Sequence, residues 1–210
     1  MYVVPPMSIK TQASINFSDM LVAAQELHKS EFGSHFLVIY HDLDTFRELY
    51  SQYAKAALKD NEIVVILPFY ETVNNVRIIL SEDSACIDVG KYEKEQSLLI
   101  IDSLKSYFGS QEGLMPFVKK IVEFAKASGR SGVSVIGDMG PFFYYGKSDG
   151  LLHYETTILP TGFEGINLKG ICVYHKQDFN KKLSEEEKLM LLEHHGGTLY
   201  LSPFFESFLT

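Results

Sequence analysis

The chain has 210 residues and a mass of 23.8 kDa, with 46% hydrophobic and 22% charged residues. These ordinary globular values exclude a disordered, collagen-like or coiled-coil protein, and the length is that of one domain. Nineteen basic against 27 acidic residues give a net charge of −8, and no more than two basic residues are consecutive. The chain therefore lacks the basic footprint of a nucleic-acid-binding domain.

The N-terminus, the apolar runs and the cysteines indicate the compartment of the protein. Residues 1–7 contain no basic residue and no long apolar stretch, which argues against a signal peptide. The longest apolar run, residues 63–70, is far shorter than the ~18 residues that a membrane span needs. Cys86 and Cys172 stand in apolar surroundings without a CxxC motif, as reduced core residues do. We therefore expect a cytoplasmic protein with no membrane partner.

Strand and helix patterns alternate along most of the chain. Residues 1–17 are expected to form an N-terminal arm, and residues 18–210 a single domain. Continuous apolar runs indicate strands buried on both faces, whereas apolar residues spaced by three and four indicate amphipathic helices. In chain order the predicted elements are a helix at 18–31, a strand at 35–40, a helix at 45–58, a strand at 63–67, a helix at 72–80, short strands at 87–89 and 98–102, a helix at 114–127, a strand at 133–138, a helix at 151–159, a strand at 171–174, a helix at 184–194 and a strand at 199–201.

This order of elements predicts the fold class. Two strands joined by a helix, as in residues 35–67, form the unit of a parallel sheet that helices cover. We therefore expect an α/β fold with a doubly wound, mainly parallel sheet and helices on both faces. Two capping boxes, Thr45 with Glu48 and Ser184 with Glu187, are expected to begin helices.

The carboxyl ends of the strands are the expected place for a ligand, because open α/β sheets bind ligands there. The residues that follow the predicted strands are carboxylates, imidazoles and aromatic rings. They are His41, Asp42 and Asp44 after 35–40, Phe69, Tyr70 and Glu71 after 63–67, Asp102 and Ser103 after 98–102, Asp138 and Met139 after 133–138, and His175 after 171–174. The alternative is that each aspartate caps the next helix and the aromatic rings cover the end of the sheet.

A standard phosphate-binding loop is not expected. Residues 140–148 end in Gly-Lys-Ser like a Walker A loop, but five residues instead of four separate the two glycines, and four of the five are bulky rings. Pro141 also removes a backbone N–H that could bind a phosphate. After the strand at 35–40, residues 41–45 contain no glycine and carry carboxylates that repel a triphosphate.

Metal and nucleophile motifs are also missing from the sequence. None of the seven histidines belongs to an HExxH motif or to a Cys/His pair with metal-ligand spacing. His194 and His195 fall in the last turn of a predicted helix, where such side chains suit exposed carbonyls. No GxSxG occurs, and Cys172 and His175 point to opposite faces of one strand. We expect no catalytic residue, no metal and no cofactor.

The ordered set of motifs resembles the MEDS sensory domain family. The resemblance begins with His35-Phe-Leu-Val-Ile-Tyr40, an acidic turn, an amphipathic helix and Asn61-Glu-Ile-Val-Val-Ile66. It continues in the same order over roughly residues 33–205. The later motifs are Val135-Ile-Gly-Asp-Met-Gly140, Leu151-Leu-His-Tyr-Glu155, Gly170-Ile-Cys-Val-Tyr174 and a terminal helix that ends in His194.

The resemblance implies a degenerate RecA/KaiC-like fold without a P-loop and a role in sensing small hydrocarbon-derived molecules in prokaryotic signalling. This sequence departs from the family at His195-Gly196, where a proline usually follows the histidine, and at Ser202-Pro203, which replaces Asn-Pro. Carried over by position, the resemblance implies ligand contacts from His35, Tyr40, Asp138, Tyr154, Glu155, Tyr174 and His194. His41 and Asp42 join this set because they follow the first predicted strand.

Two hypotheses of function follow. The first is a non-catalytic sensory domain that binds a small organic ligand at the carboxyl ends of the strands and signals through a partner protein. The second is a nucleotide-binding switch or weak ATPase without a standard Walker A loop, in which Asp138 and Glu155 hold Mg²⁺. We expect Glu155 to face the strand ends near Asp138. The aromatic tail at residues 201–209 covers either its own sheet edge or a second copy, so a homo-oligomer is possible.

Overall fold

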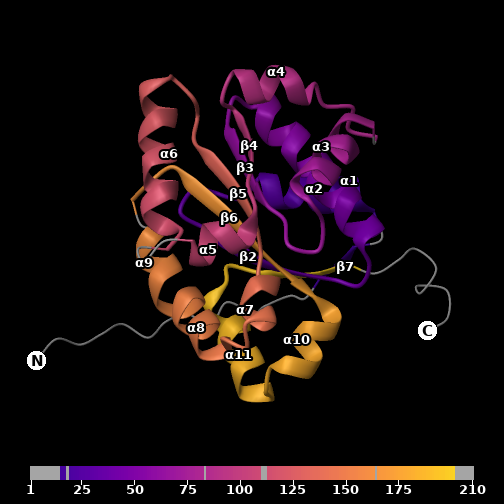
Figure 1. The fold of residues 1–210 in the computed structure, drawn as a ribbon, viewed down its shortest axis with the longest axis vertical. Helices are drawn as coiled ribbons and strands as arrows, with labels where there is room; N and C mark the ends of the chain where they lie inside the picture. Colours follow the sequence, from indigo (N-terminus) through magenta and orange to yellow (C-terminus); the bar gives the residue numbers. More distant parts are fainter. Residues whose placement is uncertain (1–14, 18, 83, 110–112, 164, 202–210) are drawn as a thin grey trace, which may run out of the picture.

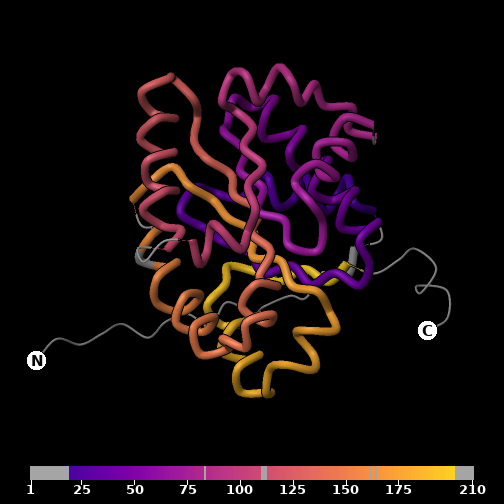
Figure 2. The backbone as a smooth tube through the Cα atoms, in the orientation of Figure 1, coloured from indigo at the N-terminus to yellow at the C-terminus, as the bar shows by residue number. Residues whose placement is uncertain are grey.

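The computed structural model describes residues 15–17, 19–82, 84–109, 113–163 and 165–201. Within these ranges the chain forms one sheet of seven parallel strands in the order β1-β7-β2-β6-β5-β3-β4. The prediction of a doubly wound, mainly parallel α/β fold is confirmed. Figure 2 traces β2 and β6, which are distant in the sequence and adjacent in the sheet. The strands are β1 (Ile15–Phe17), β2 (His35–Tyr40), β3 (Ile63–Leu67), β4 (Leu98–Ile100), β5 (Val133–Asp138), β6 (Leu168–His175) and β7 (Thr198–Leu201).

Helices cover both faces of the sheet (Figure 1). One face, called here the α1–α4 face, packs against α1 (Met20–His28), α2 (Leu43–Lys59), α3 (Val73–Glu82) and α4 (Val89–Lys94). The other face, called the α5–α11 face, packs against α5 (Ser103–Phe108), α6 (Met115–Ala127), α7 (Gly140–Tyr144), α8 (Ser148–His153), the π-helix η1 (Tyr154–Ile158), α9 (Leu159–Phe163), α10 (Lys176–Lys182) and α11 (Glu185–His194).

No helix in the described ranges is both long and apolar enough to cross a membrane.

Alternation along each strand determines which face a side chain reaches. In β2, Val38 and Tyr40 pack into the α1–α4 face, whereas Leu37 and Ile39 pack into the α5–α11 face. Burial on both faces explains why the strands read as continuous apolar runs. Each fully buried aliphatic side chain stabilises the fold by about 1.5–3 kcal/mol. The same alternation places His35 and Tyr40, both in β2, on opposite faces of the sheet.

The helix starts show which capping predictions hold. The box formed by Ser184 and Glu187 is present at the start of α11, as predicted. The box at Thr45 and Glu48 is wrong, because α2 begins earlier. Asp42 caps α2 by accepting a hydrogen bond of 2.9 Å from the backbone N–H of Thr45.

Several other expectations are corrected. The predicted strand at 87–89 is not formed, because Asp88 accepts from the backbone N–H of Lys91 and caps α4. Cys86 is exposed rather than part of the core. Residues 15–17, assigned to the arm, form β1 and pair with β7. The other arm residues and the tail at 202–210 lie outside the described residues.

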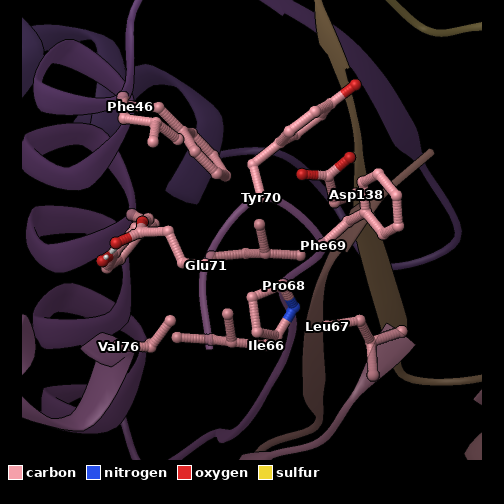
Figure 3. Close-up of a pocket in the computed structure, with 12 residues that line it drawn as sticks. Phe46, Ile66, Leu67, Pro68, Phe69, Tyr70, Glu71, Val76 and Asp138 are labelled. Carbon is pink, nitrogen blue, oxygen red and sulfur yellow. Dashed lines mark hydrogen bonds between the residues drawn. The ribbon is translucent and has the colours of Figure 1, made fainter. Parts of the chain in front are cut away.

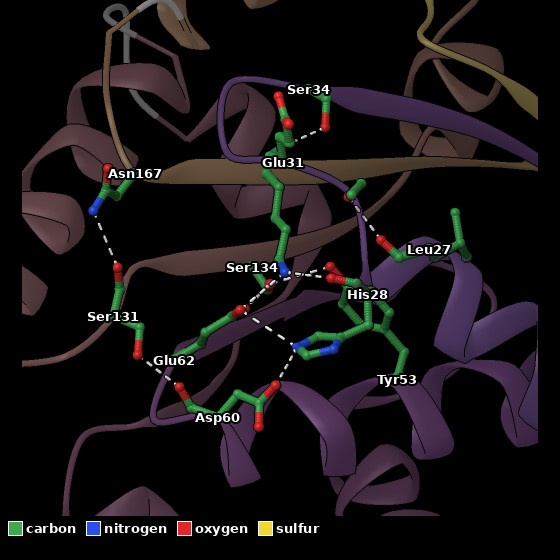
Figure 4. Close-up of polar contacts among 12 residues, drawn as sticks. Leu27, His28, Glu31, Ser34, Tyr53, Asp60, Glu62, Ser131, Ser134 and Asn167 are labelled. Atoms are coloured by element: carbon green, nitrogen blue, oxygen red, sulfur yellow. Dashed lines mark hydrogen bonds and ion pairs between the residues drawn. The ribbon is translucent and has the colours of Figure 1, made fainter.

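A buried polar network ties α1 and α2 to the amino-terminal ends of β3, β5 and β6 (Figure 4). Glu62 lies at its centre, with its carboxylate 2.9 Å from the ammonium of Lys169 and 3.4 Å from Nε2 of His28. Ser134 donates a hydrogen bond to Glu62, and Tyr53 donates one of 3.1 Å to Ser134. The network compensates charges that would be costly to bury alone.

Candidate functional site

The first polar group at the carboxyl ends of the strands is built around Asp138. This last residue of β5 is only 2% exposed, and its carboxylate accepts a hydrogen bond of 2.8 Å from the backbone N–H of Gly140. The backbone N–H groups of Phe69 and Tyr70, from the segment after β3, also donate to it. Two segments, one after β5 and one after β3, thereby hold one carboxylate on the α1–α4 face of the sheet. We call the group of side chains around this carboxylate the edge cluster.

Tyr40 adds a hydroxyl to the edge cluster. Its ring stacks on Phe46 with centroids 4.7 Å apart and meets the ring of His175 edge-on at 5.2 Å. The hydroxyl is buried and has no hydrogen-bond partner among the described residues. An unpaired buried donor costs about 1–3 kcal/mol, so this hydroxyl marks a position where a further acceptor group would be favourable.

Burial dominates the electrostatics of the edge cluster. It raises the pKa of Asp138 to about 7, and the negative charge of Asp178 adds to this effect. The pKa of Tyr40 is raised as well, first by burial and then by Asp138. Asp138 thus exchanges between its charged and neutral forms near neutral pH, and can both accept and donate a hydrogen bond.

Two hollows adjoin the edge cluster. A cavity of about 10 Å³ lies between α2 and the end of β3, and Figure 3 shows Phe46, Tyr70 and Asp138 among its lining side chains. This volume holds about one water molecule. A wider surface groove of about 510 Å³ is lined by His41, His175, Lys176, Gln177, Asn180 and Lys181. Because His175 contacts Tyr40, the groove leads to the edge cluster.

A second polar group lies on the α5–α11 face, and we call it the face cluster. Its centre is Glu155, which is 0% exposed and belongs to the π-helix η1. The hydroxyl of Tyr174 donates a hydrogen bond of 2.6 Å to Oε1 of Glu155. Nε2 of His195 lies 3.3 Å from Oε2 of Glu155, and the ring of His35 lies 4.4 Å from that of His195. The π-helical turn is a feature that often occurs at functional sites.

The ionisation of the face cluster follows from its complete burial. Burial opposes ionisation of Glu155, but His195 and the hydrogen bond from Tyr174 hold its pKa below the usual value. Burial, together with His195, lowers the pKa of His35 to about 4, so its ring is neutral at neutral pH. The pKa of the Cys172 thiol is raised by burial and by nearby Glu155.

An apolar cavity of about 20 Å³ lies beside the face cluster. Its lining includes Tyr154, Phe163, Gly170 and Cys172. Gly170 is needed there, because a Cβ at this position would lie 2.7 Å from the ring of Phe163. The same Phe163 ring lies 5.6 Å from that of His35, so the cavity and the face cluster share a wall.

The structure divides the predicted site residues between the two clusters. Tyr40 and Asp138 share the edge cluster, with His41 exposed at the groove. Asp42 is occupied in capping α2. His194 is exposed, with Nδ1 2.8 Å from the carbonyl oxygen of Met190. The remaining predicted residues, His35, Tyr154, Glu155 and Tyr174, lie on the α5–α11 face.

One expectation about this site is corrected. Glu155 does not lie near Asp138, because the helix that carries Glu155 packs on the opposite face of the sheet. Of the two consecutive histidines at the end of α11, His195 is buried and His194 is exposed. His195 and Cys172, which lie beside Glu155, were not among the predicted ligand contacts, whereas Tyr70 was expected at the carboxyl end of its strand and lies in the edge cluster.

Residues 140–148, the segment most similar to a phosphate-binding loop, have a different structure. Gly140–Tyr144 forms α7, with Pro141 in its first turn. The ammonium of Lys147 lies 4.5 Å above the ring of Phe108. A cation held on an aromatic ring in this way packs as a structural side chain.

The parallel sheet, the helices on both faces and the two polar clusters define a doubly wound α/β domain. Residues 34–188 match the family described as the MEthanogen/methylotroph, DcmR Sensory domain, MEDS. This match spans more than half of the chain, so the chain belongs to the MEDS family, a family of sensory domains. The matched range contains His35, Glu155 and Tyr174 and ends before His195. No curated protein matches the chain.

Proposed function

We propose that the chain is a non-catalytic sensory domain that binds a small organic, hydrocarbon-derived ligand at the edge cluster and signals through a partner protein. The observation that carries this proposal is the buried Tyr40 hydroxyl, which lacks a partner among the described residues. It lies in aromatic surroundings and within the electrostatic influence of Asp138. Aromatic walls with a few convergent polar groups are typical of small-molecule sites.

The edge cluster offers complementary contacts to such a ligand. The rings of Phe46 and His175 can pack against its apolar part, while Tyr40 donates to an oxygen or nitrogen. Asp138 can serve as donor or acceptor because its pKa is about 7. Lys176 and Lys181 in the groove add positive charge, which favours ligands with an anionic group.

Ligand entry requires side chains to move, because the inner cavity holds about 10 Å³. Tyr70 lines that cavity and donates a hydrogen bond to Asp178 of α10. Displacement of Tyr70 by a ligand would break this link and release α10. In this proposal, the binding energy of the ligand shifts the position of α10.

We place the surface that contacts the partner at α7. The side chains of Tyr144 and Tyr145 are 67% and 51% exposed, and aromatic residues are enriched in protein interfaces. The ring of Tyr144 lies 5.9 Å from that of Phe69, which follows β3. The partner is a signalling protein or a second copy of the chain. A cytoplasmic location agrees with the thiol state of Cys86 and Cys172.

The ligand is sought by thermal unfolding of the full chain with short-chain alcohols, amines and carboxylates, with ATP and Mg²⁺ as a separate arm. Tyr40→Phe removes the unpaired hydroxyl, and Tyr92→Phe on α4 is the matched control. We expect Tyr40→Phe to leave the melting temperature unchanged or higher, and to weaken binding of the active compound about tenfold.

Equal affinity in the Tyr40→Phe and Tyr92→Phe variants would contradict the placement of the ligand. Stabilisation by ATP at micromolar concentration would instead support the nucleotide-switch hypothesis. We expect no ATP hydrolysis and no ATP affinity tighter than about millimolar, because residues 41–45 after β2 offer no glycine-rich anion site.

A further inference from the structure

Three buried side-chain atoms of the face cluster converge without hydrogen bonds. The three residues are His35, Glu155 and His195, and one ligand atom of each lies within 4.8 Å of the other two. The unpaired atoms are Nε2 of His35, Oε2 of Glu155 and Nε2 of His195. The side chain of Glu155 and that of His195 are both 0% exposed. Each of the three atoms lacks a hydrogen-bond partner among the described residues. One unpaired buried polar atom is costly, and three within 4.8 Å of one another indicate a missing partner.

The hydrogen bonds made by the other polar atoms of these side chains indicate which kind of partner would fit. Nδ1 of His195 lies 2.7 Å from the carbonyl oxygen of Leu191. A carbonyl oxygen can only accept, so Nδ1 donates to it, and Nε2 is the ring atom that remains for another partner. Nε2 faces Oε2 of the Glu155 carboxylate at 3.3 Å. A metal ion bound between these two atoms would be a partner for both of them.

The surroundings resemble the support that metal ligands usually have. Histidine ligands commonly donate their second ring N–H to a backbone carbonyl, as His195 does to Leu191. Ligating carboxylates are commonly hydrogen-bonded as well, and Tyr174 donates to the other oxygen of Glu155. Both groups are therefore held in place, with Nε2 of His195 and Oε2 of Glu155 3.3 Å apart.

We propose that His35, Glu155 and His195 bind one divalent transition-metal ion of the Zn²⁺ or Fe²⁺ type. Two imidazoles and one carboxylate are a ligand set that proteins use for both ions. Metal–ligand bonds of about 2.0–2.2 Å place neighbouring ligand atoms roughly 3–3.5 Å apart. The 3.3 Å between His195 and Glu155 has this spacing. Three protein ligands leave a coordination position for a small molecule, and the apolar cavity next to His35 adjoins it.

The test is metal binding by the full chain, prepared without a polyhistidine tag. Its metal content is measured by elemental mass spectrometry, and after treatment with a chelator it is titrated with Zn²⁺, Fe²⁺ under nitrogen, and Co²⁺. The Co²⁺ absorption spectrum reports the ligand geometry without any substitution. We expect one ion per chain and a visible Co²⁺ band of a site with nitrogen and oxygen ligands.

The variants His195→Gln and Glu155→Gln are compared with His194→Gln, which changes the exposed neighbouring histidine. Circular dichroism selects the variants that keep the fold. We expect His195→Gln and Glu155→Gln to bind Co²⁺ roughly tenfold more weakly or worse, and His194→Gln to match the wild type. The proposal is overturned if folded wild type binds no ion, or if all variants bind equally, which would indicate surface histidines. These readouts do not depend on the ligand of the edge cluster.

Discussion

Lys169 and Glu62 form a buried ion pair in which the ammonium lies 2.9 Å from the carboxylate and each side chain is 5% exposed. The ammonium also donates a hydrogen bond of 2.8 Å to the carbonyl oxygen of His28 at the end of α1. The pair therefore joins β6 and the start of β3 to a helix of the α1–α4 face. Because both charges are removed from water, each depends on the other.

Lys169→Met is expected to lower the free energy of unfolding by about 3–5 kcal/mol, because it leaves the Glu62 charge buried without its cation. Urea denaturation measures the loss. Lys29→Met is the matched control, since Lys29 pairs with Glu26 at the surface, where the two side chains are 68% and 52% exposed. That control should change stability by less than about 1 kcal/mol. Adding Glu62→Gln to Lys169→Met should restore part of the loss, and a purely additive double variant would disprove the coupling.

The raised pKa of Asp138 predicts a pH dependence of stability. Its pKa is about 7 in the fold and 3.8 when unperturbed, chiefly because the carboxyl is buried. The folded state therefore keeps a proton that the unfolded state releases between these values. The stabilisation is complete below about pH 4 and is lost as the pH rises through about 7.

Asp138→Asn should remove this dependence, since the amide does not titrate. We expect the stability of wild type relative to Asp138→Asn to fall from pH 5 to pH 8, by at most about 2.6 kcal/mol. Thermal unfolding at a series of pH values measures the difference, with Asp149→Asn on the exposed side of α8 as the control. Parallel curves for wild type and Asp138→Asn would show that this carboxyl ionises normally.

The strands could be predicted from the sequence because they are buried on both faces. Residues 36–40 and 63–67 are continuous apolar runs, residues 133–136 contribute three apolar side chains, and the structure forms strands at these positions. The short helices α5, α7 and α10 were not predicted. They have five to seven residues, which is too short for a 3.6-residue periodicity to appear.

The site was only partly predictable, and for a different reason. His35 and Tyr40 were predicted in one site, but they lie five positions apart on one strand. An odd separation puts two side chains on opposite faces of the sheet. That signal was present in the sequence. By contrast, nothing in residue spacing connects His35, Glu155 and His195, which come from three elements far apart in the chain. The π-helical turn that buries Glu155 leaves no sequence pattern either.

Gly170 provides a direct test of how tightly the face cluster is packed. A Cβ at this position would lie 2.7 Å from the tip of the Phe163 ring and 3.7 Å from Cβ of His35. Gly170→Ala is therefore expected to shift Phe163 into the apolar cavity and to cost about 1–3 kcal/mol of stability. Gly90→Ala in α4 is the control, because a Cβ added at Gly90 would lie 3.9 Å from its nearest neighbouring atom. Alanine there should stabilise the helix by about 0.5–1 kcal/mol. Chemical denaturation compares the two variants. A Gly170→Ala protein as stable as the wild type would show that Phe163 can move at little cost.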